Sequence, residues 1–94
     1  MLVLNHIKPY FGSFFSTSIA ELRSVLTVNL LSYIYLAHGF MAPLRVSRGS
    51  IIAISSVAGK MGIPKVAIYS ASKHGVHGLF DSLRLELDLE VFIP

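Results

Sequence analysis

The sequence lacks cysteine and has few charged residues. With no cysteine among 94 residues, a disulfide framework and any zinc site built on cysteine are excluded. Charged residues make up 14% of the chain, whereas globular domains average about 25%. A free-standing domain of this size buries only about 60–65% of its unfolded surface, so these charges are too few to cover the remainder. We therefore expect a slab from the interior of a larger domain, the alternative being an unusually apolar small protein.

A dense run of basic residues is also missing. Eight lysines and arginines against five acidic residues give a formal net charge of +3, but the basic residues are dispersed. They are Lys8, Arg23, Arg45, Arg48, Lys60, Lys65, Lys73 and Arg84. Nucleic-acid binding is therefore not expected. The stretch between Leu22 and Phe80 carries no acidic residue, which favours an anionic ligand, although a solvated basic rim is the commoner explanation.

The chain shows no targeting signal. The apolar run at residues 1–4 is too short for the core of a signal peptide and has no basic region before it. The most hydrophobic stretch, residues 22–40, approaches the length of a membrane span. It contains Arg23, Ser24, Thr27, Asn29, Ser32 and His38, which make a helix facing lipid unfavourable. We interpret it as a helix buried within protein and expect no membrane span in this segment.

Apolar runs and helical periodicity alternate along the chain. Residues 1–4 and 51–54 are continuous apolar runs, and they predict strands over 1–4 and 50–55 that are buried on both faces. Apolar residues at three- and four-residue spacing predict helices over 19–43 and 67–89. Residues 91–93 are compatible with a third strand. Strands that alternate with long helices imply an α/β fold with a parallel sheet and right-handed crossovers.

Two features mark the predicted helices. Ser18 and Glu21 form the pattern of a capping box, in which each side chain accepts a hydrogen bond from the other residue's backbone N–H. Gly75 and Gly78 lie inside the second helix, where each costs about 1 kcal/mol relative to alanine. Such a cost indicates a place where another backbone comes close.

The strongest local signal is the run Tyr69-Ser70-Ala71-Ser72-Lys73. On a helix, Tyr69 and Lys73 are one turn apart and face the same way. A phenol alone is a poor acid–base catalyst near neutral pH, but a fixed ammonium beside a phenol favours its phenolate form. A two-residue pattern is common by chance. The alternative is a half-exposed tyrosine beside a surface lysine.

Two further polar residues, Ser56 and Asn29, are candidates for the same site as Tyr69 and Lys73. Ser56 follows the predicted strand 50–55, and ligands of parallel α/β sheets bind beyond the carboxyl ends of strands. Asn29 lies inside the most apolar helix, where a buried amide needs a hydrogen-bonding partner. From the residues alone, a catalytic role and a structural hydrogen bond that distorts the helix both remain open for Asn29.

In order and spacing, Asn29, Ser56, Tyr69 and Lys73 resemble the Asn-Ser-Tyr-Lys tetrad of the short-chain dehydrogenases/reductases. Further stretches look most like the branch formed by the 11β-hydroxysteroid dehydrogenases of type 1 and their near relatives. They are Leu4-Asn5-His6-Ile7, Val28-Asn29, Gly49-Ser50-Ile51, Ser55-Ser56-Val57-Ala58-Gly59-Lys60 and Tyr69-Ser70-Ala71-Ser72-Lys73. The resemblance implies that residues 1–94 form a single incomplete NAD(P)-binding domain, the central part of a doubly wound, Rossmann-type parallel sheet.

The resemblance also implies a role for each matching residue. Tyr69 would be the general acid in carbonyl reduction and the base in alcohol oxidation. Lys73 would favour the phenolate form of Tyr69 and hydrogen-bond the nicotinamide ribose. Ser56 would polarise the substrate carbonyl, and Asn29 would anchor a water that extends the proton relay from Lys73. Asn5 would line the cofactor cleft, and the hydride would belong to NADP(H).

The activity implied is the interconversion of a hydroxyl and a ketone on a steroid or similar lipophilic small molecule. Residues 57–68 would form part of the wall for this flat substrate. The complete protein would be a homodimer that packs through its two long helices. By the same resemblance it would reside in the endoplasmic reticulum, with any anchor outside this chain.

The family's glycine-rich phosphate-binding turn is absent from this sequence. We therefore expect a fragment, isoform or partial gene product with little activity alone. The alternative is a non-enzymatic truncated product that pairs with a full-length subunit through the two long helices. His74 and His77 have a spacing compatible with metal binding, but no third ligand lies nearby in the sequence, so no metal site is expected.

Overall fold

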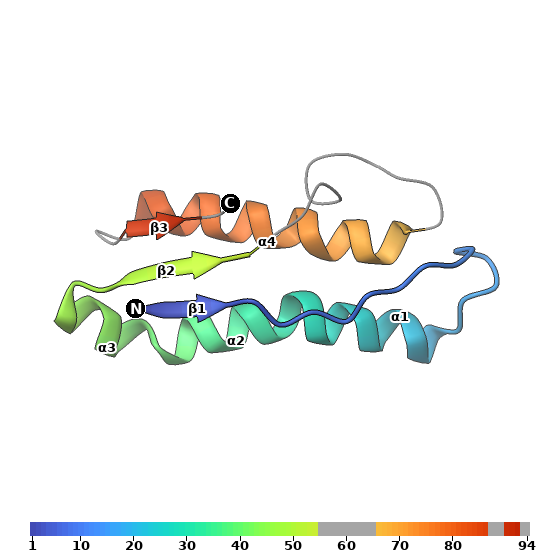
Figure 1. The fold of residues 1–94 in the computed structure, drawn as a ribbon, viewed down its shortest axis with the longest axis horizontal. Coiled ribbons are helices and arrows are strands. Elements are labelled where there is room, and N and C mark those ends of the chain that lie inside the picture. The colour runs from blue at the N-terminus through green and yellow to red at the C-terminus, as the bar shows by residue number, and fades with distance from the viewer. Residues whose placement is uncertain (55–65, 87–89, 93–94) are drawn as a thin grey trace.

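The structure, a computed structural model, describes residues 1–54, 66–86 and 90–92 (Figure 1). In chain order these residues form β1 (Leu2–Leu4), α1 (Ile19–Leu26), the π-helical turn η1 (Thr27–Leu31), α2 (Ser32–Gly39), α3 (Met41–Ser47), β2 (Ser50–Ala53), α4 (Ala67–Glu86) and β3 (Glu90–Phe92). The alternation of strands and helices predicted from the sequence is confirmed, including the third strand.

The strands form one parallel sheet in the order β1-β2-β3. Leu2 pairs with Ile51, and Ile51 pairs with Val91 on its other side. Each connection runs through helices, and two right-handed crossovers in the same direction place their helices on the same face of a sheet. Figure 1 accordingly shows β1 in front of α2 and β3 in front of α4, with β2 between them.

The sheet is covered by helices on one face only within the described residues. Leu4, Ile51, Ala53 and Val91 point to the helices and are at most 6% exposed. Val3, which points the other way from β1, is 54% exposed. The prediction that the strands are buried on both faces is therefore wrong for the described part of the chain, because all its helices lie on one side of the sheet.

The hydrophobic core lies between this sheet face and the two long helical segments. Tyr33 and Ala37 from α2, and Val76 and Phe80 from α4, are at most 2% exposed and pack with the buried strand residues. Each pair is separated by four residues, so its members stack on one helix face. This arrangement explains the helical periodicity of the sequence. It also fixes α4, whose first turns carry the candidate site.

The first predicted helix, residues 19–43, is not continuous. It contains the π-helical turn η1, and α2 ends at Gly39, after which α3 begins at Met41. In an unbroken helix, Pro43 could not donate to the Gly39 carbonyl, and its ring would clash with that carbonyl. In α3, Pro43 instead lies in the first turn, where no intrahelical N–H bond is needed. The proline therefore accounts for the break.

The predicted capping box is half formed. Ser18 Oγ accepts a hydrogen bond from the Glu21 backbone N–H at 3.1 Å, which caps α1. The Glu21 carboxylate lies 3.6 Å from Lys8 Nζ. The glutamate thus pairs with the loop after β1, and α1 keeps the serine half of the motif.

The helical run Ile19–Gly39 is long and apolar enough to cross a membrane, with 21 residues and a mean hydropathy of 1.2. Among the described residues it is the run that meets these criteria, which core helices of soluble proteins also meet. Its buried Asn29 is hydrogen-bonded to protein backbone, and its buried Tyr33 lies in the core. In the structure 17% of the apolar window is buried, so one face of the run packs within protein and the predicted burial of the whole helix is not confirmed.

Gly75 and Gly78 have different surroundings on α4. A Cβ atom at Gly75 would lie 2.7 Å from Leu30 Cδ2 in η1, whereas one at Gly78 would meet no described atom within 4 Å. A close approach is therefore present at Gly75, but the neighbour is the Leu30 side chain, so the predicted approach of another backbone is not confirmed there. It is wrong at Gly78 within the described residues.

This difference predicts opposite effects of substitution. Gly78→Ala is expected to raise the free energy of unfolding by about 0.5–1 kcal/mol, because alanine loses less backbone entropy in a helix. Gly75→Val is expected to lower it by about 1–3 kcal/mol, because the new methyl groups overlap Leu30. Urea denaturation followed by circular dichroism measures both. A Gly75→Val variant as stable as the native chain would contradict the tight contact between α4 and η1.

Candidate active site

Tyr69 and Lys73 lie one turn apart on α4. Lys73 is only 2% exposed, and its Nζ lies 5.8 Å from the centroid of the Tyr69 ring. The two side chains thus share a face, as predicted, and a surface lysine is excluded. Burial lowers the pKa of Lys73 from its ordinary value, because the charged ammonium loses hydration. In the described part of the chain, no carboxylate lies within salt-bridge distance of this ammonium.

The lowered pKa makes a stability prediction. At a pH between the lowered pKa of Lys73 in the folded chain and its ordinary value, Lys73 is protonated in the unfolded chain but deprotonated in the folded chain. Stability therefore rises with pH from the folded-state pKa up to the ordinary value of 10.5. Lys73→Met removes the buried charge, so we expect higher stability at pH 7 and a smaller rise at alkaline pH, measured by urea denaturation. A variant less stable than the native chain at pH 7 would show that the ammonium is stabilising.

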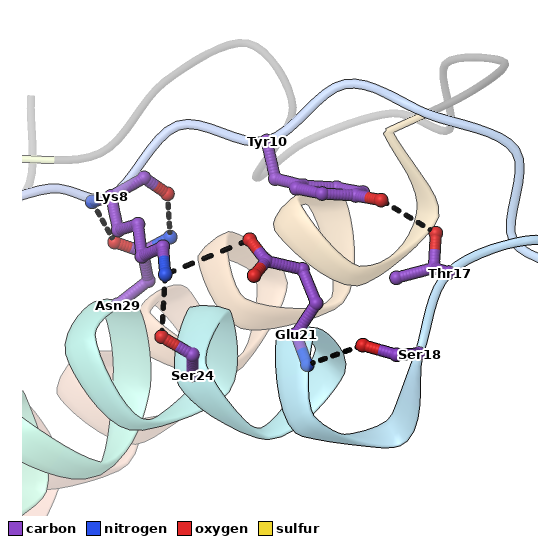
Figure 2. Close-up of polar contacts among 7 residues, drawn as sticks. All are labelled: Lys8, Tyr10, Thr17, Ser18, Glu21, Ser24 and Asn29. Atoms are coloured by element: carbon purple, nitrogen blue, oxygen red, sulfur yellow. Dashed lines mark hydrogen bonds and ion pairs between the residues drawn. The ribbon is translucent and has the colours of Figure 1, made fainter.

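Asn29 is fully buried in η1 and pairs with the loop that follows β1. Its Oδ1 accepts a hydrogen bond from the Lys8 backbone N–H at 2.7 Å, and its Nδ2 donates to the Lys8 carbonyl oxygen at 2.7 Å (Figure 2). The helix around it is π-helical, a distortion often found at functional sites. The structural hydrogen bond considered for Asn29 is therefore present. Its role in anchoring a water stays a prediction.

The Lys8 side chain provides a second anchor for the same loop. Lys8 Nζ donates to Ser24 Oγ at 2.6 Å and faces the Glu21 carboxylate, both on α1. Further along, the hydroxyls of Tyr10 and Thr17 lie 2.8 Å apart. Figure 2 shows the Lys8 contacts tying the loop to α1 and η1, and the Tyr10–Thr17 contact joining two parts of the segment before α1. Sequence reasoning missed them, because no local pattern reveals how a loop folds back over a distant helix.

A pocket of about 400 Å³ opens beside Tyr69. The described residues that line it are Pro9, Tyr10, Phe11, Val66 and Tyr69. Val66 belongs to the predicted wall 57–68, of which residues 57–65 lie outside the described residues. The sequence did not indicate the three residues from the loop after β1. They are positioned by the Lys8 contacts, so the wall of the pocket depends on the anchored loop.

Asn5 and Ser56 complete the predicted site. Asn5 directly follows β1 and is exposed at its carboxyl end. Leu4 pairs with Ala53 of β2, and the Ile54 N–H donates to the Leu4 carbonyl oxygen at 2.9 Å, so the two strands end side by side. Ser56 lies outside the described residues. Its approach to Tyr69 stays a prediction.

The two histidines of α4, His74 and His77, differ in their hydrogen bonding. His74 Nδ1 donates to the Ser70 carbonyl oxygen at 2.8 Å, one turn earlier. His77 Nε2 is buried and has no hydrogen-bond partner among the described residues. Residues 1–54, 66–86 and 90–92 contain no group of three potential ligands able to hold a metal ion.

The parallel sheet, with its helices on one face and the Tyr–Lys pair beyond the strand ends, is typical of part of a Rossmann-type α/β fold. Residues 1–91 match the family described as short chain dehydrogenase, and the chain belongs to this family. It is 41% identical over 90 residues to the hydroxysteroid 11-beta-dehydrogenase 1-like protein B of Xenopus laevis. It is 42% identical over 89 residues to the corresponding protein of Xenopus tropicalis. Each match covers 95% of this chain and 31% of the relative.

Solved structures show the same fold. A short-chain dehydrogenase from Streptomyces avermitilis superposes with a TM-score of 0.92 at 27% identity, covering 98% of this chain and 35% of that one. The F189W actinorhodin polyketide ketoreductase with NADPH gives 0.86 at 33% identity, covering 96% and 36%. A 4-hydroxyisoleucine dehydrogenase with NADH and succinate gives 0.84 at 29% identity, covering 90% and 41%. The family identification and the Rossmann-type fold predicted from the sequence are confirmed.

Proposed function

We propose that this chain supplies the catalytic centre of an NADP(H)-dependent oxidoreductase that interconverts a hydroxyl and a ketone on a steroid or similar lipophilic molecule. The observation that carries the proposal is the buried Lys73 ammonium beside Tyr69, at the edge of an apolar pocket. Such a pair can move a proton at a substrate oxygen near neutral pH. Because the chain belongs to a dehydrogenase family, we propose that this substrate oxygen belongs to a carbonyl or an alcohol group.

The described residues fit a nicotinamide cofactor. The carboxyl ends of β1 and β2 lie together, which is where parallel α/β sheets bind nucleotides. The exposed Asn5 amide lies at this edge, and the Lys73 ammonium carries donors that no described carboxylate occupies. These groups could hold ribose hydroxyls and the nicotinamide amide. When bound, the cofactor supplies or accepts the hydride.

In this mechanism the chain's own residues transfer the proton to or from the substrate oxygen and orient the substrate. In reduction, the Tyr69 hydroxyl would donate its proton to the substrate oxygen, and in oxidation the phenolate would remove it. Lys73 would stabilise that phenolate through its positive charge. Ser56 would donate a hydrogen bond to the same oxygen. Asn29 would hold the loop after β1 in place and anchor the water of the relay.

The pocket and the relatives support the proposed substrate class. Pro9, Phe11 and Val66 present apolar surface beside the reactive hydroxyl, which suits a flat lipophilic molecule. The most similar relatives reported above are named for hydroxysteroid 11-beta-dehydrogenase. Related structures contain NADPH in one case and NADH in another. NADP(H), a homodimer and residence in the endoplasmic reticulum are proposed from the resemblance to this branch.

A hybrid protein tests the proposal. Residues 1–90 of this chain would replace the matching segment of the Xenopus laevis relative, and the purified hybrid would be assayed for NADPH-dependent reduction of 11-ketosteroids. The unmodified relative serves as the control. We expect the hybrid to reduce the steroid and to prefer NADPH over NADH. A folded hybrid that binds NADPH but reduces no lipophilic ketone, beside an active control, would contradict the proposed function.

The isolated chain is expected to bind NADPH weakly and to show little turnover. General acid–base groups contribute only about 10²–10⁴-fold in rate, and that contribution is lost when the cofactor is not held against them. The chain spans 31% of the length of its curated relatives. A fluorescence titration with NADPH and an assay of cortisone reduction measure both quantities. Robust turnover by the 94 residues alone would overturn this expectation.

A second candidate is a non-enzymatic product that pairs with a full-length dehydrogenase subunit. An apolar groove of about 230 Å³ between α2 and α4 favours it, lined by Ile34, Ala37, His38, Met41, Leu79 and Leu83. Co-expression of the tagged chain with the full-length Xenopus relative would test pairing. We expect His38→Glu, at an exposed groove position, to abolish co-purification, and unchanged association would count against this candidate.

A further inference from the structure

A fully buried tyrosine that the proposed reaction does not use faces the Lys73 ammonium. Tyr33, on α2, is 0% exposed, and Lys73 Nζ lies 5.4 Å from the centroid of its ring. The same ammonium lies 5.8 Å from the Tyr69 ring. A cation within about 6 Å of an aromatic centroid is attracted by the negative face of the ring, most strongly when water is excluded.

His6 holds Tyr33 through two contacts. The Tyr33 hydroxyl donates to the His6 backbone carbonyl oxygen at 2.7 Å. The two rings lie 4.4 Å apart between centroids, tilted by 40°. The His6 ring is itself held by the Ser32 hydroxyl through Nε2, and Ser32 donates to the Val28 carbonyl oxygen. The histidine of the Asn5-His6-Ile7 stretch thereby gains a physical role that its sequence pattern did not explain.

We infer that Tyr33 is a positioning residue for Lys73: its ring, held by His6, keeps the ammonium buried and aimed along the face of α4 that carries Tyr69. The inference rests on the proposed function, in which Lys73 assists Tyr69. In the described residues, the titratable groups around the ammonium are Tyr69 on its own helix and Tyr33 from α2, and His6 is in contact with Tyr33. Aromatic rings thus take the place that a carboxylate counter-ion would occupy.

Burial also keeps Tyr33 suited to this role. Desolvation and, to a smaller extent, the nearby Tyr69 raise the pKa of Tyr33, so it stays a neutral phenol that donates to His6. The pKa of Lys73 is lowered by burial. A ring that attracts the ammonium opposes this lowering, because it stabilises the charged form over the neutral amine. Removing the ring should therefore lower the pKa of Lys73 further.

Nuclear magnetic resonance of the 94-residue chain tests the inference. The chain contains four lysines, so the ε-methylene signal of Lys73 can be assigned with Lys73→Arg and titrated with pH. We expect Tyr33→Leu to lower the pKa of Lys73 by about 0.5–1.5. Tyr33→Phe retains the ring and should leave it near the native value. Tyr35→Leu, at a position 66% exposed on the same helix, is the matched control and should not change it.

An equal or higher pKa of Lys73 in Tyr33→Leu than in Tyr33→Phe would overturn the inference. If Tyr33→Leu does not fold, Tyr69→Leu provides the decisive measurement. In that variant the Lys73 ε-methylene protons should stay shifted upfield by the ring current of Tyr33, and shifts typical of unfolded lysine would overturn the inference. Both readouts are independent of activity. A hybrid inactive with Tyr69 intact would refute the proposed function while leaving the positioning of Lys73 in place.

Discussion

Tyr69→Phe is expected to lower kcat/KM of the hybrid enzyme for its steroid by about 10²–10⁴-fold, the range contributed by a general acid or base. The substitution removes one hydroxyl and keeps the ring that lines the pocket and faces Lys73. Substrate and cofactor should therefore bind nearly as before. The loss should appear in kcat, with little change in KM. Steady-state assays at several pH values measure both constants.

Tyr35→Phe is the control for this prediction. It makes the same chemical change at a tyrosine that is 66% exposed on α2, away from the pocket. Its kcat and KM should equal those of the unmodified hybrid. A Tyr69→Phe enzyme that keeps more than about a tenth of the activity would remove Tyr69 from the role of general acid, whose contribution is at least about 10²-fold.

Asn29→Leu is expected to lower the free energy of unfolding of the chain by about 2–5 kcal/mol. The change deletes two hydrogen bonds of 2.7 Å and leaves the Lys8 N–H and carbonyl oxygen without their partner in a half-buried loop. Each buried polar group left unsatisfied costs about 1–3 kcal/mol. Urea denaturation measures the loss. Hydrogen exchange at the Lys8 amide should accelerate at the same time, because that amide loses its acceptor.

Asn29→Asp is a companion variant and Asn5→Ala is the matched control. The aspartate can still accept from the Lys8 N–H, but it places a carboxylate at a fully buried position facing the Lys8 carbonyl oxygen, so it should destabilise the chain at least as much as the leucine. Asn5 is exposed, and its replacement should change stability by less than about 0.5 kcal/mol. An Asn29→Leu chain within that margin of the native one would show that the loop is held by other contacts.

The parts of the fold that could be predicted from the sequence are those with repetitive local patterns. The unbroken apolar run around Ile51 predicted β2, and the spacing of residues such as Leu79 and Leu83 predicted α4. The register of Tyr69 and Lys73 on one helix face follows from helix geometry alone. These signals depend on neighbours in the chain, so the rest of the fold was not needed to find them.

The parts that could not be predicted depend on contacts between distant segments. Asn29 was recognised as a buried amide in need of a partner, but its partner is the backbone of Lys8, which carries no side-chain signature. The contact between the Tyr33 ring and the Lys73 ammonium forms only because α2 and α4 pack side by side in the fold. The three- and four-residue spacing of residues 19–43 predicts a helix with an apolar face, to which Tyr33 belongs, and nothing more about Tyr33. Its buried hydroxyl and the nearby His6 give it further roles that hydrophobic pattern does not encode.

The central claim is that Tyr69, Lys73, Ser56 and Asn29 converge on one reacting oxygen and its proton relay. A crystal structure of the hybrid with NADP⁺ and a steroid tests it most directly. The account predicts the Tyr69 and Ser56 hydroxyls within hydrogen-bonding reach, about 2.6–3.2 Å, of the same substrate oxygen, with Lys73 contacting the cofactor ribose. A Ser56 hydroxyl directed away from Tyr69, or a steroid bound outside the pocket beside Tyr69, would contradict it.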